Sequence, residues 1–508
     1  MLAASLTLSP FMMSVSQLLL LLVWLFMGDP VKVKLGRFFH DKIAILLVSL
    51  YLLHIVGLVY TSDFAYAFKD LRVKLPLLIL PLVLSTVKPL PKKYFDLLLL
   101  VYVASIFVAS CFSFGIWLRH DYGDVREISR FVSHIRFCLN IVLVIGIMAY
   151  YLYTRPEPWW ERLLQGILIL WFLFQLHILE SISGYLALAG MVAGTLLYVY
   201  FTIIRKALWR VLAIVVMVGI PLVVAIWLCH MVRPMMATPK VDFETLDKKT
   251  SLGNDYWHDT VCFPAENGRY VGLYFCRPEM REAWNRRSQL DYDGQTLNGE
   301  ILEATLARYL TSKGLRKDAD GVAALTGDDI RRVEQGIANY ENWSHPGLRS
   351  RLSATVFEYQ QYRRHNTPNG GSLSQRIEYT RASLYLIRKH PVFGVGTGDI
   401  PNAYQQAYDE LDSPLQPEFR HKAHNQYLSI AVGFGIIGLA IFLFILLYPF
   451  CSSGRYRTYL YTIFLIILLL SMLPEDTIES QAGVTWFAFF NSLLIFALGN
   501  REENLQKR

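Results

Sequence analysis

The feature that most constrains this chain is a series of long apolar runs. They lie near residues 8–27, 42–61, 75–88, 95–118, 133–154, 162–179, 183–203, 209–230, 425–450, 458–473 and 484–499. A helix needs about 20 apolar residues to cross the hydrocarbon core of a bilayer, and most of these runs approach that length. Hydrophobic residues make up 54% of the chain and its mean hydropathy is +0.33. We therefore predict an all-α polytopic membrane protein with about 11–12 transmembrane helices.

The short loops between these runs predict how the chain is oriented. Basic residues gather in alternate loops, at Lys32, Lys34, Arg37 and Lys42, then at Lys88, Lys92 and Lys93, then at Arg155 and Arg162, then at Arg205, Lys206 and Arg210, and finally at Arg455 and Arg457. The intervening loops are mixed or acidic. Because cytoplasmic loops are enriched in Lys and Arg, we expect the N-terminus outside, the C-terminus inside and the segment 231–424 outside.

This orientation predicts four parts. Residues 1–230 form an N-terminal transmembrane block of about eight spans, and 231–424 form a large outer domain. Residues 425–500 contain about three further spans, and 501–508 form a cytoplasmic tail. In the outer domain, residues 241–281 suggest loops or short strands, whereas apolar residues recur at three- and four-residue steps between 297 and 362. The domain is therefore predicted to be mainly helical.

The net charge of +8 does not indicate nucleic-acid binding. Residues 231–424 contain 25 Lys and Arg against 25 Asp and Glu, so the basic excess lies in the cytoplasmic loops. Membrane topology and anionic lipids account for that distribution. Of the six cysteines, Cys262 and Cys276 share the outer domain. They could form a disulfide or remain free, and the absence of a CxxC pattern argues against a cysteine metal site.

One stretch concentrates polar and glycine-rich patterns at the membrane boundary. Arg376 opens a helix on which Ile377, Leu384 and Ile387 are expected to pack inward. His390-Pro-x-x-Gly-x-Gly396 follows, then His424-Asn-x-x-Leu428, then Gly435-x-x-Gly438 inside an apolar helix. The glycines of the first loop are expected to let it lie flat against the membrane block.

The order of these motifs resembles the signature region of the O-antigen ligase and polysaccharide polymerase superfamily. Its members are polytopic membrane glycosyltransferases that use polyprenyl-diphosphate-linked glycans. The resemblance implies a GT-C-like architecture, a bacterial inner-membrane location and a periplasmic outer domain. It also implies that no cofactor is needed, because the lipid diphosphate is the leaving group.

His424 stands where an apolar helix begins. Free backbone N–H groups and the positive end of the helix dipole should lower its pKa and keep the ring neutral, as a general base requires. Position alone suits a base and a simple helix cap equally well, and the resemblance implies the base. His421 could orient His424 or meet phosphate. A metal site formed by His421 with Asp476 or Glu479 is the weaker interpretation, and we predict no metal.

Several cations could hold the diphosphate. The motif position of Arg376 implies this role, since guanidinium grips phosphate through two N–H groups. His134 and Arg136 begin one span, and Arg72 and Lys74 precede another. These four could be interfacial side chains that reach toward water, or an anion site facing the same outer pocket.

Two positions depart from the family pattern. Ile182 stands where an arginine would fall, so Arg136, Arg72 or Lys74 would have to replace it. Gly433 stands where the family frequently has Glu. Both changes alter the set of charges expected around the base.

The resemblance implies an inverting glycosyltransferase of the O-antigen ligase type. It would move a preassembled glycan from undecaprenyl diphosphate to a hydroxyl of lipid A-core, with His424 as base. An O-antigen or capsule repeat polymerase and a protein O-oligosaccharyltransferase stay open as alternatives. A polysaccharide or lipid transporter would instead favour charged or broken helices at the bilayer midplane and internal repeats.

Overall fold

The computed structural model describes residues 1–119, 125–156, 158–202, 204, 206–237, 240–261, 263, 265–345, 347–369, 371–452 and 458–497. Helices dominate these residues; the named strands are the antiparallel pair β1 (Ala265–Glu266) and β2 (Arg269–Tyr270). The chain divides into two compact units. Unit 1 comprises Met1–His120, Ile128–Met217 and Arg376–Arg508, and unit 2 comprises Asp121–Glu127 and Val218–Gln375.

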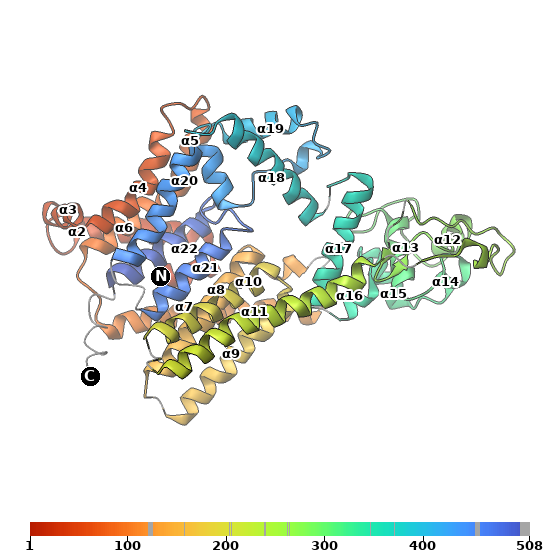
Figure 1. Cartoon of the computed structure of the whole chain (residues 1–508), viewed down its shortest axis with the longest axis horizontal. Helices are drawn as coiled ribbons and strands as arrows, with labels where there is room; N and C mark the ends of the chain where they lie inside the picture. Colours follow the sequence, from red (N-terminus) through yellow and green to blue (C-terminus); the bar gives the residue numbers. More distant parts are fainter. Residues whose placement is uncertain are drawn as a thin grey trace. The chain divides into compact units, whose positions relative to one another are not determined.

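Unit 1 contains most of the apolar helices and several of mixed polarity. They are α1 (Leu2–Leu8), α2 (Pro10–Phe26), α3 (Val31–His40), α4 (Lys42–Val56), α5 (Phe64–Lys74), α6 (Pro76–Thr86), α7 (Lys92–Arg119), α8 (His134–Thr154), α9 (Trp159–Leu179), α10 (Ile182–Thr202), α19 (Ile400–Glu410), α20 (Gln426–Ser452), α21 (Tyr459–Ser471) and α22 (Gln481–Ser492). Short turns add η3 (Pro417–Phe419) and the π-helical η5 (Leu493–Ala497), whereas η1 (Val125–Ile128) lies mostly in unit 2. Helices α11 (Ala207–Met236) and α18 (Ser372–Lys389) include residues of both units. Within unit 1 the C-terminal helices pack among earlier ones, α22 on α6, α20 on α4 and α21 on α8 and α10 (Figure 1).

The prediction of an all-α polytopic membrane protein is confirmed. Among the described residues, α7, α8, α9, α10 and α20 are long and apolar enough to cross a membrane. Helices α2 and α3 would qualify as a pair but are bent by 108°. Other expected spans are shorter helices, such as α4, α21 and α22. Helix α6 has 11 residues, which cover about 16 Å at 1.5 Å per residue. It continues from α5 through Leu75, which has helical φ and ψ.

Helix α20 is broken at Gly435, whose φ is 66° and ψ −166°. The loop 391–398 fills the break. Val395 N–H donates to the Val432 carbonyl at 2.9 Å, and Ile436 N–H donates to the Pro391 carbonyl at 2.9 Å. A Cβ on Gly435 would lie 2.1 Å from the Val392 carbonyl oxygen. Glycine therefore supplies both the left-handed φ and the space that this backbone-to-backbone packing needs.

A small core at the start of α20 positions the segment that contains His424. It consists of Tyr379, Ala382, Leu386, Ile400, Tyr404, Ala407, Tyr408, Leu415, Ala423 and Val432. Of the three residues predicted to pack inward on α18, Ile387 packs against this core, whereas the prediction is wrong for Ile377, which is 36% exposed, and for Leu384, which is 45% exposed. Tyr379, Ala382 and Leu386 form the buried stripe instead, at the three- and four-residue steps of one helix face.

Unit 2 has a core of its own. Its helices are α12 (Arg277–Asn285), α13 (Leu302–Ser312), α14 (Ala319–Ala323), α15 (Gly327–Glu334), α16 (Tyr340–Ser344) and α17 (Leu348–His365), with the short turn η2 (Phe243–Thr245). Trp284, Tyr292 and Tyr309 are fully buried in its centre. Cys276 is buried with a free thiol, and the predicted pairing involves Cys262, which lies outside the described residues.

Candidate functional site

The site is organised by the acidic loop, residues 472–480, which joins α21 to α22. Its Asp476 accepts the backbone N–H of His424 at 3.1 Å and the hydroxyl of Ser429 at 2.6 Å. Gln426 N–H donates to the Met472 carbonyl at 2.9 Å, and its side-chain oxygen accepts Ile478 N–H at 2.8 Å. These bonds fix the acidic loop against the first turns of α20.

Asn425, rather than His424, caps the helix. The Asn425 Oδ1 accepts Leu428 N–H at 3.1 Å, and its Nδ2 donates to the Leu473 carbonyl at 2.9 Å. Capping by an Asn side chain satisfies one of the free N–H groups at the helix start. His424 has a left-handed backbone with φ of 48°. A non-glycine residue in that region is strained, and such strain is common at functional sites.

The imidazole of His424 lies in a polar and aromatic setting. Its ring centroid is 5.4 Å from that of Tyr379 and 6.2 Å from that of His421. Burial, together with the positive charges of Arg376, His421 and Lys422, lowers the pKa of His424 to about 4. The ring is therefore neutral near pH 7 and can accept a proton.

Two predicted arginines interact with the same carboxylate, one by contact and one through its charge. Arg376 Nη2 lies 3.5 Å from Glu475 Oε1, and the two side chains are 31% and 20% exposed. Burial raises the pKa of Glu475, Arg376 and Arg136 oppose that rise, and Asp476 adds to it. Glu475 is therefore a counter-ion within electrostatic reach of both guanidinium groups.

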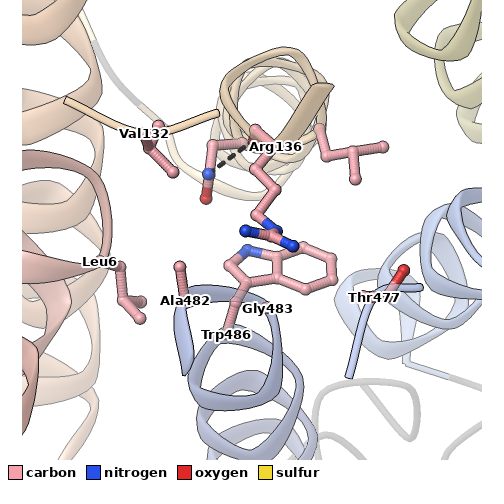
Figure 2. Close-up of a pocket in the computed structure, with 9 residues that line it drawn as sticks. Leu6, Val132, Arg136, Thr477, Ala482, Gly483 and Trp486 are labelled. Atoms are coloured by element: carbon pink, nitrogen blue, oxygen red, sulfur yellow. Dashed lines mark hydrogen bonds between the residues drawn. The ribbon is translucent and has the colours of Figure 1, made fainter. Parts of the chain in front are cut away.

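Arg136 projects into a small cavity next to the acidic loop. Figure 2 shows its guanidinium over the indole of Trp486. The cavity measures about 10 Å³ and is lined by Thr477, Gly483 and Trp486, among others. A Cβ on Gly483 would lie 3.3 Å from Arg136 Nε, so the glycine leaves room for the guanidinium. The cavity has space for about one water, so a phosphate does not fit beside Arg136 there, and this guanidinium can act on a ligand only through its charge.

Lys74 has a different setting. It is 1% exposed and pairs with Asp70 at 2.7 Å and with Glu479 at 3.1 Å. Glu479 also pairs with Lys422 at 3.1 Å. Burial opposes the charge of Glu479, but Lys74 and Lys422 outweigh it and hold the pKa of that carboxyl below its usual range. This buried network ties α5 to the acidic loop, and two carboxylates already neutralise Lys74.

The remaining predicted residues lie apart from this ion-pair network or have other bonds. Arg72 and His421 are exposed. His134 Nε2 lies 2.6 Å from the Leu179 carbonyl, so that ring is occupied by a backbone contact. Ile182, at the departure from the family pattern, is 42% exposed. In the described ranges, no group of three His, Cys, Asp or Glu residues is placed to hold a metal ion.

Residue patterns did not single out Glu475, Lys422 or Asn425 as parts of the site. Asp476 was considered only as a possible metal ligand with His421. In the structure it bonds His424, 52 positions earlier, and Glu475 interacts with Arg136, about 340 positions earlier. Local spacing contains no signal for pairs of that separation. An Asn directly before an apolar helix is a recognisable capping signal, and it could have identified Asn425.

Comparison with known families finds one matching segment. Residues 348–443 match the family described as O-Antigen ligase. The matched segment includes Arg376, loop 391–398, His424 and the break in α20. No curated protein matches the chain. The matched segment and the membrane helices both support a place for the chain in the O-antigen ligase superfamily.

Proposed function

We propose that this enzyme transfers a preassembled glycan from undecaprenyl diphosphate to a hydroxyl group of lipid A-core. The reaction would occur at the periplasmic face of the bacterial inner membrane. The observation that carries the proposal is the placement of a neutral imidazole, His424, beside Arg376 where α20 begins. A base and a phosphate-binding cation at one helix start are the groups that this transfer needs.

His424 acts as general base in this proposal. The acceptor oxygen forms a bond to the anomeric carbon while its proton passes to the His424 ring. The bond from that carbon to the diphosphate oxygen breaks, and both electrons leave with the diphosphate. A single displacement of this kind inverts the anomeric centre. Asp476 and Asn425 hold the backbone on either side of the ring in place.

Arg376 binds the departing diphosphate, and Arg136 adds a second positive charge. Both charges interact with the single carboxylate of Glu475, which offsets part of them. Glu475 is the most easily displaced carboxylate of the acidic loop, because its contact with Arg376 is 3.5 Å long. Asp476 and Glu479 are held by contacts of 2.6–3.1 Å. Donor phosphate therefore replaces Glu475, whereas Lys74 and Lys422 keep the acidic loop anchored.

A genetic complementation experiment tests the proposal. In a strain lacking the gene, His424→Ala and Arg376→Ala are expected to leave lipid A-core without attached glycan, although both proteins reach the membrane. Arg388→Ala is the matched control, because Arg388 is exposed on the same helix as Arg376 and should restore transfer.

The products also distinguish the related reactions. Shortened glycan chains on an otherwise capped core would indicate a polymerase, and unglycosylated proteins would indicate a protein transferase. Full transfer by both the His424 and Arg376 variants would disprove the assignment of the site.

A further inference from the structure

A second polar site lies where α20 ends and α4 begins, away from the His424 site. Helix α20 begins at the acidic loop and ends at Ser452. Helix α4 runs from Lys42 to the turn at Gly57, whose carbonyl accepts the Thr397 N–H of loop 391–398. A groove of about 620 Å³ lies where α20 ends and α4 begins, with the end of α6 as a third wall. By the predicted orientation this is the cytoplasmic side.

The groove presents positive charge and hydroxyl groups. Arg37, His40 and Lys42 line it together with Ser85 and Tyr448. Arg37 is held by Asp29 at 2.6 Å and by the Thr86 carbonyl at 3.1 Å, with 41% of its side chain exposed. Lys42 is exposed, and its ammonium has no hydrogen-bond or ion-pair partner among the described residues.

The single carboxylate in the lining is already engaged. Asp41 Oδ1 accepts Ile43 N–H at 2.9 Å and Ala44 N–H at 3.1 Å, which caps α4. Phe38, Ala44 and Val48 pack with residues of α6 and η5 in a small apolar core, which holds together the helices that supply the lining. Arg37 and Lys42 carry more charge than the single lining carboxylate, and Asp29 offsets part of the charge of Arg37.

Apolar surface leads away from the groove along α20. The ring of Tyr448 contacts that of Phe444, one turn earlier, with centroids 4.9 Å apart. Phe444 is 54% exposed, and Leu447 and Ile441 are 43% and 40% exposed. On the other wall, Phe39 at the end of α3 is 67% exposed. A helix that combines basic residues with exposed apolar ones, as α3 does, is typical of the membrane interface.

We propose that this groove binds the phosphate of an anionic phospholipid, with the acyl chains along the exposed face of α20. Lys42 and Arg37 contact the phosphate, and Tyr448 can donate a hydrogen bond to one of its oxygens. A lipid without net charge brings its own ammonium group and gains less from two cations. This site is distinct from the His424 site, and the proposal does not depend on the transferred glycan.

The test measures lipid retention by the purified full-length protein. Phosphatidylglycerol or phosphatidylcholine is titrated into detergent-solubilised protein, and bound lipids are counted by native mass spectrometry. Wild type is expected to retain phosphatidylglycerol preferentially. Lys42→Gln should weaken that binding about fivefold, the effect of one basic residue at an anionic surface. Lys92→Gln/Lys93→Gln is the matched control, because it removes two exposed cations outside the groove and should leave retention unchanged.

Further arms test the nature of the ligand. Phe444→Ser should also reduce phosphatidylglycerol retention, since it removes apolar surface without changing charge. Equal losses of phosphatidylglycerol retention in Lys42→Gln and in the Lys92/Lys93 control would show a general attraction of the lipid to basic residues and would overturn the proposal. Displacement of the lipid by millimolar inorganic phosphate would show a small-anion site and overturn it too. Unchanged thermal unfolding of lipid-free Lys42→Gln confirms that the variant is folded.

Discussion

Glu475 offers the sharpest test of the site, because it occupies the position that we assign to the donor. If donor phosphate must displace this carboxylate from Arg376 and Arg136, removing its charge should tighten donor binding. Glu475→Gln keeps the size and polarity of the side chain and removes only the charge. Tighter binding caused by the loss of a side-chain charge is a result that a purely structural ion pair would not produce.

The magnitude follows from the geometry of the pair. Unit charges 3.5 Å apart attract by about 5 kcal/mol at an effective dielectric constant of about 20. The side chains are 31% and 20% exposed and make a single long contact. Fully exposed ion pairs contribute only about 0.2–1 kcal/mol. This pair is partly buried, so its contribution should lie between that range and the Coulomb value, and we take about 1–2 kcal/mol. The donor dissociation constant should therefore fall about five- to thirtyfold.

The assay uses protein in nanodiscs with an undecaprenyl-diphosphate glycan. Donor affinity is measured at equilibrium, and the transfer rate is measured in single turnovers at saturating donor. Glu410→Gln is the matched control, because Glu410 pairs with Lys389 at 2.8 Å with similar exposure on α19. Unchanged affinity in Glu475→Gln would refute the displacement. A rate loss of about 100-fold or more would mean that Glu475 itself transfers the proton.

Four further predictions follow from the same structure. Since protonation inactivates the base, kcat/KM should stay constant as pH falls from about 7 to about 5 and should be halved near the His424 pKa of about 4; a midpoint near 6.5 would contradict this. Arg376→Lys keeps the charge but loses the bidentate hydrogen bonds to phosphate, so donor KM should rise about tenfold with little change in kcat; an unchanged KM would argue against phosphate contact. Asn425→Ala should lower the free energy of unfolding by about 0.5–2 kcal/mol, measured by thermal denaturation in detergent, because α20 loses its cap. Gly435→Ala should destabilise the protein by at least about 1–3 kcal/mol, since φ of 66° and a 2.1 Å approach to Val392 both exclude a Cβ; normal thermal stability and protease resistance would show that the break in α20 can relax.

Part of the site could be predicted from residue patterns, and part could not. His424 and Arg376 were predicted because each has a fixed place in a short motif. Two of the three inward residues predicted on α18 were wrong, because the aliphatic side chains of Ile377 and Leu384 suggested a stripe that Tyr379, Ala382 and Leu386 form instead. Amphipathic periodicity identifies a helix well, but it chooses poorly between two faces that are both partly apolar.

By itself the sequence determined that this protein is a bundle of membrane helices with a mainly helical insertion, because apolar run length and helical spacing are local properties. It also determined which helix start bears an imidazole. Only the tertiary structure decided which charges remain available to a ligand. Lys74 is neutralised by Asp70 and Glu479, whereas Arg376 and Arg136 share the loosely held Glu475. Those partners come from α5, α8, α18 and a loop near the C-terminus, and helix packing alone brings them together.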